Sequence, residues 1–199
     1  MEIIVATKNK GKIREIRKAL KGLGLKIYSL NDFLDVPEIE EDGESFTENA
    51  LKKARFYSKY FGKVTLADDS GLEVDALKGL PGIYSARYAG EGASDRKNNQ
   101  KLLGEMEAIQ VSKRGASFKC VMVMVFQDGK EAVVEGSCRG RIGFREVGKK
   151  GFGYDPLFIL PQYAKTMAQL TLGEKNRVSH RGKALKKLRK IIVRTFRSL

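Results

Sequence analysis

A short apolar segment that ends in two adjacent carboxylates constrains the fold more than any other part of the sequence. Residues 64–67 are typical of a buried strand, and they lead directly to Asp68, Asp69, Ser70 and Gly71. Neighbouring side chains on a strand point to opposite faces, so the two aspartates cannot share one pocket if the strand continues. We expect one carboxylate to face a functional site and the other to hold a loop or a helix start.

The residues around this pair leave two interpretations open. The alternation of apolar and polar side chains in residues 72–77 predicts a second strand, after a tight turn at Ser70-Gly71. A carboxylate at a strand end beside a glycine turn suits metal binding or general-base catalysis. The same Asp-Asp-Ser-Gly pattern is also typical of an ordinary turn.

A lysine-rich segment near the start of the sequence predicts a phosphate-binding loop. Residues 2–6 are an expected strand, and apolar residues at helical spacing follow from Ile13. The connection consists of Thr7, Lys8, Asn9, Lys10, Gly11 and Lys12. Free backbone N–H groups at a helix start favour phosphate, and the lysines add positive charge. A polar connection with solvated lysines explains the segment equally well, since the Walker pattern is absent.

An acidic cluster precedes a helix whose two ends are marked in the sequence. The cluster includes Glu40 and Glu41, and it predicts either a solvated loop or a cation site. Ser45 and Glu48 then have the spacing of a capping box, and Gly62 is a typical residue just after a helix. We expect a helix between these signals.

The second half of the sequence predicts a β-hairpin and two further candidates for ligand binding. Residues 116–142 contain two expected strands joined by an Asp-Gly turn. The glycine-rich residues 148–160 carry aromatic side chains on which a base could stack, or which could equally belong to the core. His180, the only histidine, stands beside Arg181 at the start of a basic final helix, where both could donate hydrogen bonds.

Composition limits the class of protein. The 199 residues carry a net charge of +14, which suits a polyanionic substrate, a nucleic-acid partner or the charge-rich surface of a heat-adapted protein. No apolar run reaches the roughly 20 residues that span a membrane, and we expect no signal peptide. The protein is therefore expected in the cytoplasm, with Cys120 and Cys138 reduced. A solvated face is the simpler explanation of the basic final helix, so nucleic acid is not expected as a partner.

Six motifs, in order and with matching spacing, resemble the inosine-triphosphate/xanthosine-triphosphate pyrophosphatase family of non-canonical purine nucleotide hydrolases. The resemblance runs the whole length of the chain. The motifs are TKNKGK at 7–12, SFTENA at 45–50 with KAR at 53–55, ADDSGL at 67–72, PGIYSARY at 81–88, GFGYDP at 151–156 and SHRGKAL at 179–185.

The resemblance implies an α/β fold with a long mixed central β-sheet flanked by helices, in two lobes with the active site in the cleft between them. It implies one nucleotide pyrophosphatase domain over residues 1–199, without a linker, that forms a homodimer. It also implies Mg²⁺-dependent hydrolysis of ITP, dITP and XTP to the nucleoside monophosphate and pyrophosphate.

The same resemblance implies a role for each site residue. Asp69 would be the general base, and Ser70 would contact the substrate. Glu40 would bind the metal with Asp69, although the neighbouring Glu41 could serve in place of Glu40. The residues implied for phosphate binding are Thr7, Lys8, Asn9, Lys10, Gly11, Lys12 and Lys53, with Asn9 and Lys12 as the main side-chain donors. The residues implied around the base are Phe152, Gly153, Tyr154, Asp155, Lys175, His180 and Arg181.

The implied base pocket has a chemical logic. Hypoxanthine and xanthine present an acceptor, O6, where adenine presents an amino group, so His180 and Arg181 as donors would reject adenine. Three alternatives remain open. They are a pyrophosphatase with a different or broader base preference (Maf-like), a non-catalytic nucleotide sensor, and a nucleic-acid-binding module.

Overall fold

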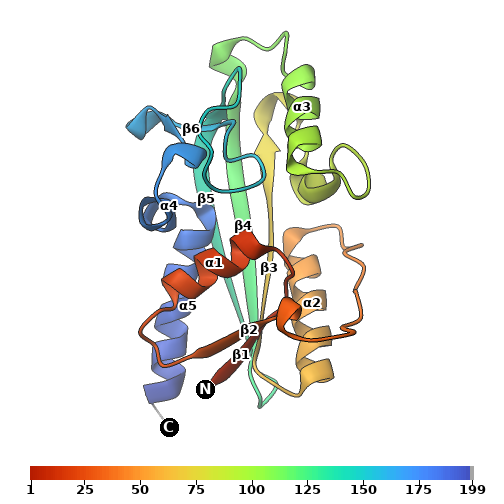
Figure 1. The fold of residues 1–199 in the computed structure, drawn as a ribbon, viewed down its shortest axis with the longest axis vertical. Coiled ribbons are helices and arrows are strands. Elements are labelled where there is room, and N and C mark those ends of the chain that lie inside the picture. Colours follow the sequence, from red (N-terminus) through yellow and green to blue (C-terminus); the bar gives the residue numbers. More distant parts are fainter. Residues whose placement is uncertain (198–199) are drawn as a thin grey trace. The chain divides into compact units, whose positions relative to one another are not determined.

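One mixed sheet organises the molecule. The computed structural model describes residues 1–197, with side chains described for residues 1–195. Within this range, seven strands lie in the order β2-β1-β3-β4-β5-β6-β7. The strands are β1 (Glu2–Val5), β2 (Lys26–Ser29), β3 (Thr65–Val74), β4 (Gly115–Val125), β5 (Glu131–Ile142), β6 (Phe158–Leu160) and β7 (Lys165–Thr166). The helices are α1 (Lys10–Ala19), α2 (Phe46–Phe61), α3 (Asp95–Glu105), α4 (Leu172–Val178) and α5 (His180–Arg197). The predicted α/β fold with a mixed central sheet is confirmed (Figure 1).

The chain divides into two compact units. The first contains Met1–Asp69, Cys120–Gly136 and His180–Leu199, and the second contains Ser70–Lys119 and Ser137–Ser179. Strands β3, β4 and β5 each contribute residues to both units. The cleft between two lobes and the single domain over residues 1–199 stay predictions.

In the first unit, helices cover both faces of the sheet. Helices α1 and α5 pack on one face, where Ile16 and Leu188 join an apolar cluster that includes Leu66 of β3. Helix α2 packs on the other face, where Ala54 joins a second cluster that includes Ala67. Leu66 and Ala67 are consecutive residues of β3 and lie in different clusters, because side chains along a strand alternate between its two faces. Strand β1 runs parallel to both β2 and β3.

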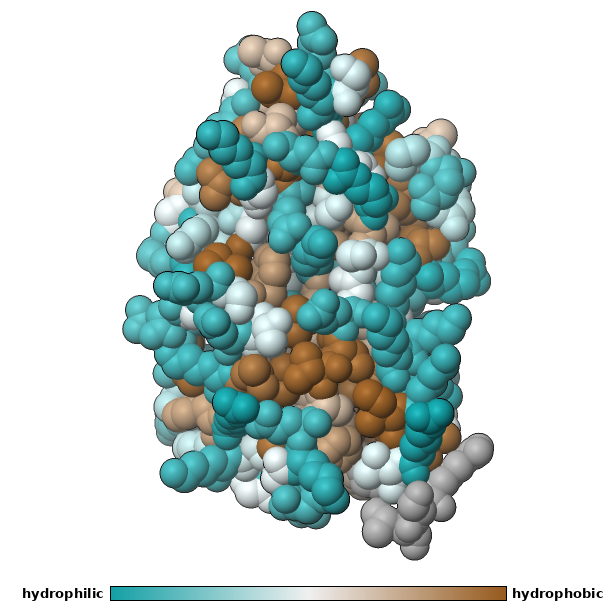
Figure 2. Space-filling model, turned by 180° about the vertical axis from the view of Figure 1, so that it is seen from behind, coloured by the Kyte–Doolittle hydropathy of each residue, from teal (hydrophilic) through white to brown (hydrophobic). Residues whose placement is uncertain are grey.

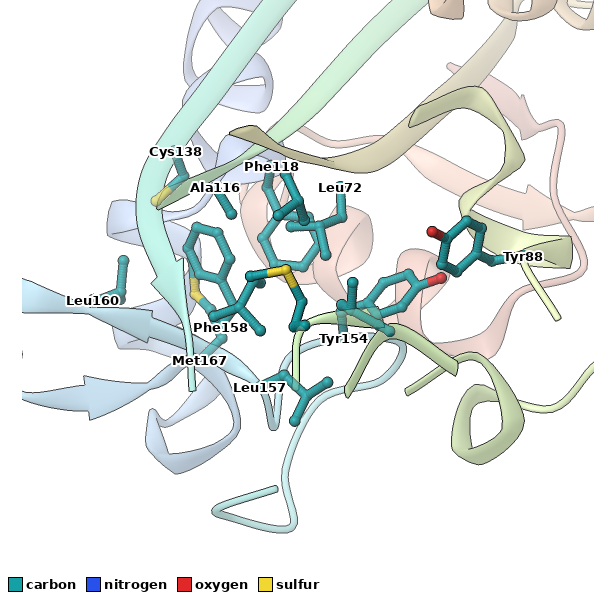
Figure 3. Close-up of a cluster of buried hydrophobic side chains, with 14 of the residues drawn as sticks. Leu72, Tyr88, Ala116, Phe118, Cys138, Tyr154, Leu157, Phe158, Leu160 and Met167 are labelled. Carbon is teal, nitrogen blue, oxygen red and sulfur yellow. The ribbon is translucent and has the colours of Figure 1, made fainter. Parts of the chain in front are cut away.

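The second unit has its own apolar core, part of which Figure 3 shows. The rings of Phe118 and Phe158 have centroids 4.5 Å apart, and Tyr154 and Leu157 lie in the same cluster. Strand β6 pairs antiparallel with both β5 and β7. The segment between β5 and β6 contributes Tyr154 and Leu157 to this core, and the packing of these two side chains restricts the movement of its backbone.

Strand β3 is longer than predicted. It continues through Gly71 to Val74, so the predicted turn at Ser70-Gly71 and the predicted second strand over residues 72–77 are wrong. In the sheet, β3 lies between β1 and β4. Strand β1 pairs with β3 at Thr65 and Leu66, so beyond that point β4 is the neighbouring strand, and membership of the sheet overrides the local turn preference of a Ser-Gly pair. A short 3-10 helix, Asp75–Leu77, follows the strand.

Several local predictions are confirmed. The Asp-Gly turn joins β4 to β5, with Gly129 at φ 80°. Ser45 caps α2 by accepting a hydrogen bond from the backbone N–H of Glu48, and Gly62 ends the helix in the left-handed conformation. The capping box is incomplete, because the Glu48 carboxylate accepts the N–H of Glu44 rather than that of Ser45.

The surface agrees with the charged composition. Hydrophilic side chains cover much of the face seen in Figure 2, and hydrophobic side chains gather in patches between them. None of the helices within residues 1–197 combines the length and the apolar character that a membrane crossing requires.

Candidate active site

The alternation of side chains along β3 sends Asp68 and Asp69 toward different helices of the first unit. Asp68 pairs with Lys12 of α1 and Arg181 of α5. Asp69 lies beside Lys53 of α2. This matches the apolar residues just before them, since Leu66 faces α1 and α5 whereas Ala67 faces α2. The prediction that the two carboxylates face different surroundings is confirmed.

Asp68 is the centre of a buried ionic network. One carboxylate oxygen lies 2.5 Å from Lys12 Nζ. The other accepts hydrogen bonds from Arg181 Nε, at 2.9 Å, and from the thiol of Cys120, at 3.1 Å. Burial by itself would raise the pKa of Asp68, but Arg181 and Lys12 hold it well below its usual range. Asp68 is therefore a fixed negative charge.

Lys53 brings the acidic residues of the site together. Its side chain is 8% exposed, and Nζ donates to the main-chain oxygen of Asp68 at 2.9 Å and to the Glu41 carboxylate at 2.9 Å. The distance from Nζ to Asp69 Oδ1 is 3.5 Å. Burial opposes the charged form, yet Asp69 and Glu41 raise the pKa of Lys53 above its ordinary value. The ammonium is thus a permanent cation.

Asp69 differs from Asp68 in its unused bonding capacity. Its Oδ2 is buried and has no hydrogen-bond partner within the described side chains. Burial raises the pKa of Asp69 to about 6; Glu41 and Asp68 also raise it, and Lys53 and Lys12 oppose this rise. A buried oxygen without a partner is costly, so its presence indicates an atom reserved for a water, a cation or a substrate.

The two candidate metal ligands in the acidic segment lie in different surroundings. Glu41 contacts Lys53. Burial by itself would raise the pKa of Glu41, but Lys53, and to a smaller extent Lys12, lower it below the ordinary value. Glu40 is exposed. Within the described residues, no group of three or more His, Cys, Asp or Glu side chains could hold a metal. Asp69 and Glu41, which both lie beside Lys53, are two carboxylates of this cluster that could contact a cation.

The predicted phosphate loop is shorter than expected. Helix α1 begins at Lys10, so Gly11 lies in its first turn rather than in a loop. Asn9 caps the helix, with Oδ1 accepting the N–H of Lys12 at 3.0 Å, and Thr7 Oγ1 accepts the N–H of Asn9 at 3.2 Å. Lys8 pairs with Glu38 at 2.7 Å. Because Oδ1 of Asn9 is used in the cap, its amide nitrogen is the atom of this side chain that can donate to a phosphate.

Arg181 has a different neighbourhood from the one its predicted role requires. Its guanidinium is 1% exposed and donates to Asp68 and, at 2.8 Å, to Glu15 of α1. This geometry favours holding Asp68 in place over donation to a base, which stays a prediction. His180 is buried as the first residue of α5.

A second cluster lies in the second unit. Lys175 of α4 pairs with Asp155, and its Nζ lies 4.7 Å from the ring centre of Phe152. Asp155 also accepts the backbone N–H of Phe152 at 2.9 Å. Tyr154 lies in the core and donates its hydroxyl to the main-chain oxygen of Ser85 at 2.9 Å. Of the aromatic pair, Phe152 is thus the ring that can stack on a base.

The structure brings several of the predicted site residues into these two clusters. The first contains Lys12, Glu41, Lys53, Asp68, Asp69 and Arg181. The second contains Phe152, Asp155 and Lys175. Ser70 is half-buried in β3, and Lys10 is exposed on α1. The sequence reasoning missed Glu15 and Cys120, although the three-residue spacing of Lys12 and Glu15 on a helix places both on one face.

Comparisons with known proteins agree over nearly the full chain. A family model described as the Ham1 family matches residues 3–191. The dITP/XTP pyrophosphatase of Desulforamulus reducens is 48% identical over 196 residues, which cover 98% of each chain. That of Geobacter sulfurreducens is 52% identical over 183 residues, or 92% of each chain. A HAM1 protein structure from Coxiella burnetii matches with a TM-score of 0.87 at 41% identity, covering 98% of this chain and 99% of that one. The family resemblance is thereby confirmed, and the chain belongs to the Ham1 family.

Proposed function

We propose that this chain is a nucleoside triphosphate pyrophosphatase that hydrolyses dITP, ITP and XTP to the monophosphate and pyrophosphate. Asp69 carries the proposal, because its buried Oδ2 has no partner within the described side chains and two cations stand nearby. The names of relatives that are 48% and 52% identical support the substrate class.

The two lysines of the first cluster would bind the phosphates. Lys12 and Lys53 both contact the main-chain oxygen of Asp68, at 3.4 and 2.9 Å, so their ammonium groups converge on one point. Two cations that the protein holds in place before substrate arrives stabilise charge on a leaving pyrophosphate without reorganisation during the reaction. The amide of Asn9 and the backbone N–H groups at the start of α1 would add donors.

Asp69 would act as the general base. Its pKa of about 6 leaves most of the carboxylate ionised at neutral pH, yet basic enough to orient and deprotonate a water. The unpartnered Oδ2 is the atom available to that water.

The residues present fit a magnesium ion. Asp69 and Glu41 would hold it, and Mg²⁺ in nucleotide enzymes commonly uses one or two carboxylates together with substrate phosphates and water. When bound, the ion would polarise phosphate oxygens and neutralise part of their charge. Glu41 replaces Glu40 in this proposal because Glu40 is exposed and Glu41 contacts Lys53.

The second cluster would recognise the base. Phe152 offers a ring for stacking, and Lys175 offers donors for the O6 acceptor of hypoxanthine or xanthine. The Asp155 carboxylate holds Lys175 and supplies an acceptor for base N–H groups. The homodimer and the cytoplasmic location implied by the family resemblance belong to the same proposal.

The test is a product analysis. Purified protein is incubated with dITP, ITP, XTP, ATP and GTP in Mg²⁺, and nucleotides, pyrophosphate and orthophosphate are separated by anion exchange. We expect monophosphates and pyrophosphate from the first three substrates, with ATP and GTP nearly untouched. Orthophosphate with a diphosphate would contradict the reaction, equal cleavage of all purines would contradict the base assignment, and tight binding without turnover would favour a sensor.

A further inference from the structure

Both main-chain groups of Gly153 are held by side chains from one helix. The N–H of Gly153 donates to Asp95 Oδ2 at 2.6 Å. The carbonyl of Gly153 accepts from Asn99 Nδ2 at 3.2 Å. Asp95 and Asn99 are four residues apart on α3, which places them on the same face of the helix. Helix α3 therefore grips a single glycine at two points.

The grip acts on a glycine-rich segment whose other contacts include the Phe152 N–H bond to Asp155 and the packing of Tyr154 in the core. Gly148, Gly151 and Gly153 all have positive φ, at 90°, 80° and 59°, and glycine has the largest conformational freedom in the unfolded chain. Hydrogen bonds to the N–H and the C=O of Gly153 define the orientation of the two peptide groups that flank it. The ring of Phe152 and the carboxylate of Asp155 are attached to this backbone.

We propose that Asp95 and Asn99 are positioning residues for base recognition, which they control by fixing Gly153 and thereby Phe152. The inference rests on the proposed function, because it takes the cluster of Phe152, Asp155 and Lys175 as the base site. Neither α3 residue contacts that cluster directly through a described side-chain bond; their effect passes through the Gly153 backbone.

The hydrogen bonds of Asn99 allow an experiment that distinguishes a positioning role in base recognition from a contribution to stability alone. Asn99 is 3% exposed, and its Nδ2 donates to Glu146 as well as to Gly153. Within the described side chains, its Oδ1 is buried without a hydrogen-bond partner. An unpaired buried acceptor costs stability, and an apolar side chain of similar size would remove that cost. Asn99→Leu loses the two hydrogen bonds of Nδ2 but also removes the unpaired Oδ1, so it should weaken base binding more than it lowers thermal stability.

The experiment compares four variants with the wild type in kinetics, thermal melting and calorimetric binding of the reaction product IMP. For Asn99→Leu and Asp95→Ala we expect KM for dITP and Kd for IMP to rise about tenfold, with kcat changed by less than about threefold. Asp95→Asn keeps an acceptor for the Gly153 N–H but loses the charge, so it should restore most of the affinity lost in Asp95→Ala.

The matched control is Asn98→Ala. Asn98 is as buried as its neighbour and also bridges a loop, but it bonds Ala86 and Ala89 instead of Gly153. It should lower the melting temperature and leave KM near the wild-type value. Unchanged KM and Kd in both Asn99→Leu and Asp95→Ala, or an equal rise in Asn98→Ala, would overturn the inference.

Failure of the proposed function gives a different result. If the wild type binds IMP without hydrolysing dITP, the enzyme assignment fails while the Kd series still decides the role of α3. If the wild type neither binds nor hydrolyses these nucleotides, both proposals are overturned.

Discussion

The ammonium of Lys53 lies 2.9 Å from the main-chain oxygen of Asp68, whose own side chain pairs with Lys12. One residue of β3 therefore holds both lysines of the candidate phosphate site, one through its carbonyl and the other chiefly through its carboxylate. Asp69, the next residue, is left with an oxygen free of hydrogen bonds to described side chains. Two adjacent residues of one strand thus have different tasks. Asp68 holds the two lysines, and Asp69 is the candidate general base.

Replacing Asp69 with Asn should abolish turnover while keeping the fold. We expect kcat to fall by about 100-fold or more, because a general base contributes on that scale. The raised pKa of Asp69 means that its ionised form is less favourable in the folded than in the unfolded chain. Loss of that charge should leave the melting temperature at or above the wild-type value. Substantial remaining kcat in a well-folded variant would exclude Asp69 as the base.

Neighbouring lysines of α2 offer a matched pair for testing the phosphate clamp. Lys53→Met removes a buried cation and should lower kcat/KM by about 100-fold. Lys52→Met removes an ammonium that is 40% exposed and pairs with Asp42, so it should have little effect. Steady-state kinetics on dITP measure kcat/KM for both variants. A similar loss of kcat/KM in the two would show that the total charge, rather than the position of the lysine, matters.

The neighbouring glutamates can be separated in the same way. Glu41→Gln should raise the Mg²⁺ concentration for half-maximal activity by about tenfold, because it removes one of two proposed ligands. Glu40→Gln should not, since that carboxylate is exposed. A magnesium titration of both variants, with EDTA-treated protein as the starting point, measures the difference. A shift confined to Glu40→Gln would restore the assignment implied by family resemblance.

Arg181 should matter for stability more than for the choice of base. Arg181→Met leaves two buried carboxylates, Asp68 and Glu15, without their shared cation, and we expect a loss of about 3 kcal/mol or more in urea unfolding. Lys186→Met, at an exposed position on the same helix, serves as the control. If Arg181→Met unfolds like the wild type but loses the preference for dITP over dATP, then Arg181 contacts the base as the family resemblance implies.

Local signals in the sequence were sufficient for much of the fold. Ser45 and Gly62 mark the two ends of α2 because capping depends on a few neighbouring residues. The Asp-Gly turn identified the hairpin for the same reason. The continuity of β3 through Gly71 was not predictable in this way, because it depends on pairing with strands far away in the sequence.

The site shows the same division. The adjacent carboxylates and the lysines could be found from sequence patterns, and alternation predicted that Asp68 and Asp69 would face different surroundings. The partners of Arg181 could not be found from sequence patterns, since 113 residues separate it from Asp68. The grip of Asn99 on Gly153 also joins residues 54 positions apart. Long-range contacts of this kind follow from the packing of elements and leave no local pattern.

The opposite facing of Asp68 and Asp69 limits how β3 can change its length. A strand has a side-chain period of two, so inserting or deleting one residue just before this pair would turn each carboxylate to the opposite face of the sheet. A deletion would put Asp69 in the place of Asp68, beside Arg181 and Lys12, and Asp68 would lose both of these cations. Insertions can be absorbed in the loops that precede β3. Within the strand, a shift by one residue would both break the ion pairs of Asp68 and move Asp69 out of its position as the candidate general base.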